Sequence, residues 1–121
     1  IANRYVSASK AHLGANVPED ERKDFFKWLD NLEYKTNGIP KEDLTILLKV
    51  DPKIGQKNLG DTKDIHESNL KHLTQAGKIY LQLAKSNSNW YVVDCIKAGK
   101  MKPKEEIHKK IMEIFGCYKL P

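Results

Sequence analysis

Residues 62–85, TKDIHESNLKHLTQAGKIYLQLAK, form the longest stretch of this sequence with regularly spaced apolar residues. At about 100° per residue, the apolar side chains cover more than half of a helical wheel. They are Ile65, Leu70, Leu73, Ala76, Ile79, Tyr80, Leu81, Leu83 and Ala84. An arc this wide predicts a central helix that packs against neighbours on several sides.

Two further helices are predicted after the central one. Residues 86–89, SNSN, are rich in residue types that cap helices. Residues 90–98 are apolar almost throughout, which predicts a buried helix that Gly99 ends. Pro103 suits the first turn of a last helix, which Gly116 ends.

Three shorter segments before the central helix are also predicted to be helical. Residues 3–13 form the first, with Gly14 as its end. Residues 18–38 open with a proline and three acidic residues, which favour a helix N-terminus. Residues 40–51 form the third, and residues 50–62 form a loop because they follow no helical or strand period. The apolar face of the third helix consists of Leu44, Leu47 and Leu48.

The sequence as a whole predicts an all-α fold. No alternating pattern of useful length indicates a strand. We expect a single helical domain over residues 1–121, a compact bundle of about six helices around a long central helix. The residues expected to be least exposed are Leu73, Ile79, Leu83, Trp90, Val93 and Ile96.

The charge of the chain indicates where a partner would bind. The 121 residues include 21 Lys or Arg and 16 Asp or Glu, a net charge of +5, and no apolar run reaches the roughly 20 residues of a membrane span. Arg4 and Arg22 are the only arginines, which disfavours specific nucleic-acid recognition. A lysine-rich turn is either a solvated face or a partner surface, and comprises Lys97, Lys100, Lys102, Lys104, Lys109 and Lys110. The loop offers a second candidate surface at Lys53, Ile54, Lys57 and Leu59.

No catalytic, cofactor or metal site is predicted. His66 and His72 are six residues apart, so a helix would separate them by about 120° and they would make a poor metal pair. No Gly-x-Ser-x-Gly turn or comparable nucleophile arrangement is present in the sequence. We therefore expect a protein that is not an enzyme and that binds no cofactor.

The start of the chain favours secretion, and secretion in turn favours a disulfide between the two cysteines. The chain begins at Ile1, as a mature secreted protein or a trimmed chain does, and this favours an extracellular protein. In that setting Cys95 and Cys117 would form an intrachain disulfide. The last helix would then have to cross obliquely, or the tail after Gly116 would have to fold back, to bring the two sulfurs together.

Two segments, NRYVSASKAHLG at residues 3–14 and FFKWLDNL at residues 25–32, resemble a family of small mosquito salivary proteins that includes anophensin and albicin. The cysteine pair and the chain length add to the resemblance. The resemblance implies a secreted inhibitor of host plasma defence cascades that acts by binding, most directly at the convertase of the alternative complement pathway. It gives no binding residues.

Two alternatives remain open at this point. One is an inhibitor of the contact (kallikrein-kinin) system acting at anionic surfaces, and the other is a helical carrier of a lipid or small apolar ligand. The partner would be a host plasma protein complex in the first two cases. Neither the partner's identity nor the oligomeric state follows from the sequence.

Overall fold

The fold mixes helices with two small sheets. The computed structural model describes residues 1–58 and 67–118, with the backbone alone at 56–58 and 67–68. The elements are α1 (Val6–Gly14), α2 (Arg22–Asp30), β1 (Thr45–Lys49), α3 (Pro52–Asn58), α4 (Glu67–Ser86), β2 (Trp90–Asp94), β3 (Ile96–Lys97), β4 (Lys100–Met101) and α5 (Lys104–Cys117). The predicted all-α bundle of about six helices is therefore wrong.

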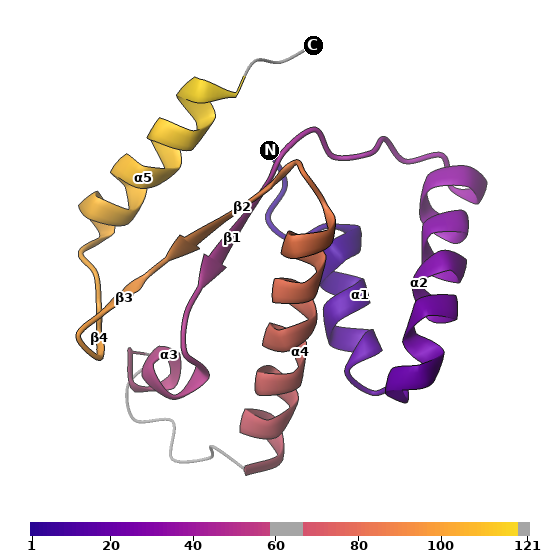
Figure 1. The fold of residues 1–121 in the computed structure, drawn as a ribbon, viewed down its shortest axis with the longest axis horizontal. Helices are drawn as coiled ribbons and strands as arrows, with labels where there is room; N and C mark the ends of the chain where they lie inside the picture. The colour runs from indigo at the N-terminus through magenta and orange to yellow at the C-terminus, as the bar shows by residue number, and fades with distance from the viewer. Residues whose placement is uncertain (59–66, 119–121) are drawn as a thin grey trace.

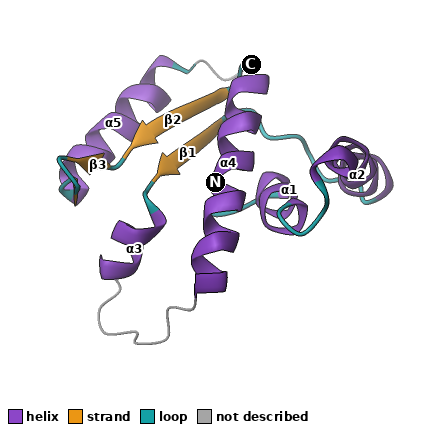
Figure 2. Cartoon of the chain, turned by 60° about the horizontal axis from the view of Figure 1, so that its bottom comes forward, coloured by secondary structure: helices purple, strands orange, loops and turns teal. Residues whose placement is uncertain are grey.

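The elements lie side by side in a fixed order. Figures 1 and 2 show α5 on one side of the paired strands β1 and β2, and α4 on the other side. Beyond α4 lie α1 and then α2. Among the described residues, no helix is long and apolar enough to cross a membrane.

Four of the predicted helices are confirmed within the described residues. The segments predicted from their flanking glycines and prolines and from apolar periodicity contain α1, α4 and α5. The predicted start of the central helix, residues 62–66, lies outside the described residues. α2 is preceded by a 3₁₀ turn at Glu19–Glu21 and continues as a π-helix at Asn31–Thr36. An amphipathic pattern accompanies α2, α4 and α5, whereas α1 has almost none.

Two segments predicted as helices are strands instead. β1 pairs with β2 in parallel, with Thr45 opposite Trp90 and Lys49 opposite Asp94. The amide of Thr45 donates to the Asn89 carbonyl and the amide of Cys95 donates to the Lys49 carbonyl. Aromatic and β-branched residues dominate β2, WYVVD, and they pack well on a pleated surface. Periodicity alone does not separate so short an apolar run from a buried helix.

A tight hairpin occupies the rest of the segment predicted as a buried helix. β3 and β4 pair antiparallel, with Lys97 opposite Lys100. The two loop residues between them have positive φ values, 52° at Ala98 and 75° at Gly99. A two-residue type I′ loop needs this left-handed backbone, so Gly99 serves the turn rather than the end of a helix.

The predicted loop is partly a helix, α3. Asp51 and Pro52 begin it, whereas the sequence analysis took them as the end of the preceding segment. The Asp51 carboxylate accepts a hydrogen bond from the Lys53 amide at 2.8 Å, and Pro52 occupies the first helical position. Asp at the N-cap followed by Pro is a favourable helix start.

The core lies between α1 and α4. Ala11, Ala76, Ile79 and Leu83 form its buried centre, with Phe26 and Trp90 packed against it. A Cβ placed on Gly14 would lie 3.0 Å from the Phe26 ring, so a larger residue there would require this ring to shift by a few tenths of an ångström. Of the predicted core residues, Ile79, Leu83 and Val93 are buried, Trp90 and Ile96 are half-buried, and Leu73 is exposed.

The segment before β1 is held by side chains from three distant places. The Tyr5 hydroxyl donates to the Pro40 carbonyl at 2.6 Å. The Tyr118 hydroxyl donates to the Asp43 carbonyl at 2.9 Å, and the Asn89 amide donates to the Glu42 carbonyl at 3.2 Å. These bonds fix where β1 enters the sheet.

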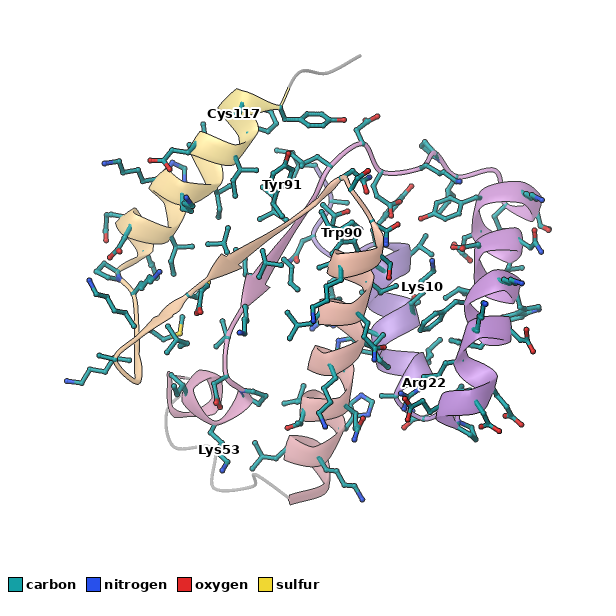
Figure 3. All side chains as sticks on the ribbon, viewed as in Figure 1. Lys10, Arg22, Lys53, Trp90, Tyr91 and Cys117 are labelled. Atoms are coloured by element: carbon teal, nitrogen blue, oxygen red, sulfur yellow. The ribbon has the colours of Figure 1, made fainter. Side chains whose placement is uncertain are left out.

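The two cysteines are free thiols in this structure, so the predicted disulfide is not formed in it. Cys95 is 1% exposed after β2, and its burial raises the pKa of its thiol. Cys117 is exposed near the end of α5 (Figure 3).

We expect thiol titration to distinguish these two cysteines. Without reductant, one thiol, that of Cys117, should react with a chromogenic disulfide reagent in the folded protein, and two should react after unfolding. A Cys117→Ser variant should lose the fast phase only. No reactive thiol in the unfolded, unreduced wild-type protein would instead show that the disulfide forms.

Candidate functional site

The six lysines predicted as a partner surface lie on the β3–β4 hairpin and on α5. Lys97 belongs to β3, Lys100 belongs to β4 and Lys102 follows it. Lys104, Lys109 and Lys110 lie in α5 and are exposed.

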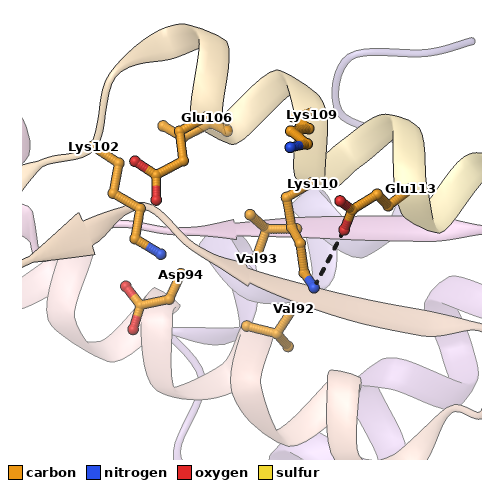
Figure 4. Close-up of a pocket in the computed structure, with 9 residues that line it drawn as sticks. Val92, Val93, Asp94, Lys102, Glu106, Lys109, Lys110 and Glu113 are labelled. Carbon is orange, nitrogen blue, oxygen red and sulfur yellow. Dashed lines mark ion pairs between the residues drawn. The ribbon is translucent and has the colours of Figure 1, made fainter.

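A cavity of about 350 Å³ lies between β2 and α5, and carboxylates share it with the lysines. Its lining consists of Val92, Val93, Asp94, Lys102, Glu106, Ile107, Lys109, Lys110 and Glu113. Figure 4 shows the Lys110 ammonium facing the Glu113 carboxylate, and the two lie 3.7 Å apart. Because equal numbers of both charges line it, this cavity has little preference for an anion. Partner binding at this turn stays a prediction.

The second predicted surface falls on α3 and beyond it. Lys53 is exposed and Ile54 is half-buried in that helix. Lys57 lies within its backbone range, and Leu59 lies outside the described residues. The part that the structure describes therefore offers a short helix with one exposed lysine, and partner binding here also stays a prediction.

A shallow depression of about 370 Å³, wide open to solvent and called the Arg4 cavity, lies at the start of α1. It is lined by Arg4, Tyr5, Ala8, Ser9, His12 and Leu13. Ala8, Ser9, His12 and Leu13 lie on one face of α1, and Arg4 and Tyr5 come from the non-helical residues just before it. The cavity combines an arginine, a hydroxyl and two rings around an apolar wall, which is the usual composition of a small-molecule site.

Arg4 gives this cavity its charge. Its backbone has a φ of 68°, a left-handed conformation that is uncommon for arginine and is favoured at sites where the surrounding structure requires it. Its side chain is exposed and forms no hydrogen bond or ion pair with another described residue. By contrast, Arg22 donates its Nε–H to the carbonyls of Gly14 and Val17 and so closes the end of α1 (Figure 3). Of the two arginines, Arg4 has the guanidinium free for a ligand.

One lining residue of this cavity, His12 on α1, contacts two rings of α4, His72 and Tyr80, that do not line the cavity themselves. The His12 ring centroid lies 5.7 Å from that of His72 and 5.8 Å from that of Tyr80, which it meets edge to face. Burial lowers the pKa of His12 below its usual value, and the positive charges of Arg4 and His72 lower it further. Burial also raises the pKa of the Tyr80 hydroxyl. His12 is therefore neutral at pH 7.

This arrangement suits an anion attached to a ring. The Arg4 guanidinium offers paired N–H donors that match the geometry of a phosphate group. No side chain caps the first turn of α1, and the Ala8 amide in that turn donates to the Tyr5 carbonyl at 3.0 Å. No group of three or more His, Cys, Asp or Glu side chains within residues 1–58 and 67–118 is placed to hold a metal ion.

The sequence analysis missed this site. It used Arg4 only to argue against nucleic-acid binding, and it considered His72 only as a partner of His66, which lies outside the described residues. The available signal was an arginine just before a helix, with polar residues Ser9 and His12 on the face that follows it.

Comparison with known proteins finds a partial similarity to two curated enzymes. The chain is 26% identical over 103 residues to thymidylate kinases of Mycobacterium tuberculosis, from strain CDC 1551/Oshkosh and from strain ATCC 25618/H37Rv. Each match covers 77% of this chain and 48% of the relative, so the chain spans about half the length of the curated relatives it matches. No protein-family model matches the chain.

The similarity corrects one expectation. A protein without enzymatic activity was predicted because no nucleophile motif is present in the sequence. Both of these matches are to kinases, and this finding contradicts that prediction. Phosphoryl transfer depends mainly on positioning and on charge stabilisation, and therefore needs no nucleophile motif.

Proposed function

We propose that this chain carries a nucleotide-binding part of a kinase that acts on a nucleoside monophosphate, with thymidylate as the first candidate substrate. The observation that carries the proposal is the Arg4 cavity, in a chain similar to thymidylate kinases. The Arg4 guanidinium and the His12 imidazole would bind the phosphate, and the ring of Tyr5 would contact the base or sugar. The net charge of +5 also favours an anionic ligand.

The shape of the cavity supports this assignment. Its six residues come from one turn-and-helix segment, and the charge of Arg4 acts on His12 across it. Tyr5 is fixed by the hydrogen bond from its hydroxyl to the Pro40 carbonyl. A phosphate site with a ring beside it matches a nucleoside monophosphate better than a free phosphate.

We expect Arg4→Ala to weaken thymidine monophosphate binding by about 10- to 100-fold, because one charge-assisted pair of hydrogen bonds is lost. Isothermal titration calorimetry on the chain at pH 7.5 measures this. Arg4→Lys should lose less affinity because it keeps the charge but not the fork of donors. Lys23→Ala, which removes an exposed charge from α2, is the matched control and should bind like the wild type.

Thymidine provides the second arm of this experiment. It lacks the phosphate, so Arg4→Ala should leave its weak binding unchanged. Equal affinity of wild type and Arg4→Ala for thymidine monophosphate, or no binding by a folded wild-type chain, would refute the proposal.

Convertase inhibition, contact-system inhibition, carriage of an apolar ligand and secretion all stay predictions. No contact among the described residues favours any of them over nucleotide binding.

A further inference from the structure

Two histidine rings lie close together beside the Arg4 cavity, and only His12 lines it. His12 lines the cavity from α1, and its ring centroid lies 5.7 Å from that of His72 on α4. Neither imidazole has an ion-pair partner among the residues that the structure describes. Two rings so close, beside an arginine and without a carboxylate partner, do not hold a second positive charge unless an anion joins them.

The charged and titratable groups around His12 are few. Arg4 precedes α1, and His72 and Tyr80 face His12 from α4. On α2, the Asp30 carboxylate binds the Lys10 ammonium at 2.7 Å through an oxygen that has no other hydrogen-bond partner. Lys10 lies two residues before His12, so that pair sits on the opposite face of α1. Arg22 on α2 binds the carbonyls at the end of α1.

We propose that His12 and His72 form a proton-dependent part of this anion site, so that binding of a doubly charged phosphate or sulfate group beside Arg4 draws a proton onto the histidine pair. This inference rests on the proposed function, since it assigns the anion to the Arg4 cavity. A protonated imidazole supplies two N–H donors where a neutral one supplies one, and its charge adds to that of the guanidinium. The site would therefore select the fully ionised form of its ligand.

The sign of the pH effect follows from linkage. The lowered pKa of His12 favours its neutral form in the free protein, and a bound dianion would raise that pKa again. Binding then takes up a proton, so the affinity for a dianion rises as the pH falls through the pKa of the complex. Phosphate monoesters gain a proton themselves near pH 6, which opposes this gain. Sulfate stays doubly charged over the same range and is the cleaner probe.

The experiment measures sulfate binding to the 121-residue chain at pH 7.5 and pH 5.5, at constant ionic strength, by the amide chemical shifts of α1. We expect wild-type affinity to be about tenfold higher at pH 5.5, equivalent to about 1.4 kcal/mol. His12→Gln should remove most of this pH dependence and His72→Gln should reduce it. His108→Gln removes an exposed histidine of α5 and should leave the dependence intact.

A second readout follows the proton directly. The imidazole resonances should show the His12 pKa rising when sulfate saturates the site, whereas that of His108 stays constant. Each variant is first checked for its far-ultraviolet circular dichroism, so that a loss of fold is not taken for a loss of binding.

The outcomes separate this inference from the proposed function. Equal sulfate affinity at both pH values, together with Arg4-dependent thymidine monophosphate binding, overturns the histidine proposal and leaves the kinase proposal standing. A pH dependence that persists in His12→Gln also overturns it. If neither sulfate nor thymidine monophosphate binds the folded chain at any pH, both proposals are wrong.

Discussion

Replacing Ile79 with alanine is expected to lower the free energy of unfolding by about 2–5 kcal/mol. Ile79 is 1% exposed at the centre of the core between α1 and α4, and its Cδ1 lies close to Gly14. Truncation removes three carbons from contact and leaves a cavity that the surrounding helices fill only partly. Urea unfolding followed by circular dichroism measures the loss.

Leu73→Ala is the control for this change on the same helix. Leu73 is 36% exposed, so its truncation should cost less than about 1 kcal/mol. The comparison decides the rotational position of α4, because the sequence analysis placed both residues in the core. Equal losses for the two variants would contradict the structure.

Val93→Asp is expected to destabilise the fold by at least about 3 kcal/mol or to prevent folding. Val93 is 3% exposed in β2 opposite Leu48, and a carboxylate there would be buried without a partner. The free energy of unfolding again gives the measurement. Where the variant does not fold, Val93→Thr, with a loss of about 1–3 kcal/mol, provides a measurable substitute.

Val92→Asp is the matched control for the strand. Val92 is the preceding residue, is 43% exposed and points to the other side of β2, so the same change should cost much less there. Had residues 90–98 formed the helix predicted from the sequence, both valines would have been buried. Similar losses at the two positions would therefore restore that helix and contradict the strand.

The helices were predictable because their evidence is local. α1, α2 and α5 each carry a proline or glycine at an end, and α4 shows its amphipathic face over several turns. The strands were not predictable because their evidence is distant. β1 and β2 lie 45 residues apart in register, and neither segment shows alternation, since a parallel strand is apolar on both faces. Leu47 and Leu48 also favour helix by propensity, and pairing overrides it.

The site was hidden for the same reason. His12 and His72 meet only because α1 packs against α4, and nothing near either residue in the sequence predicts that contact. The lysine-rich turn could be recognised in the sequence, but the acidic residues that lie beside these lysines in the fold were not considered. Asp94 comes from β2 and Glu106 and Glu113 come from α5, and the fold brings all three into one cavity with the lysines.

The tyrosine contacts before β1 tie both ends of the described chain to one short segment. Tyr5 is both a wall of the Arg4 cavity and a donor to Pro40, while Tyr118, at the end of α5, donates to Asp43. Both hydroxyls thus donate to backbone carbonyls within residues 40–43. A local opening of that short segment releases the cavity wall and the last helix together, so the slowest amide exchange in α1 and around Tyr118 should report one shared opening event.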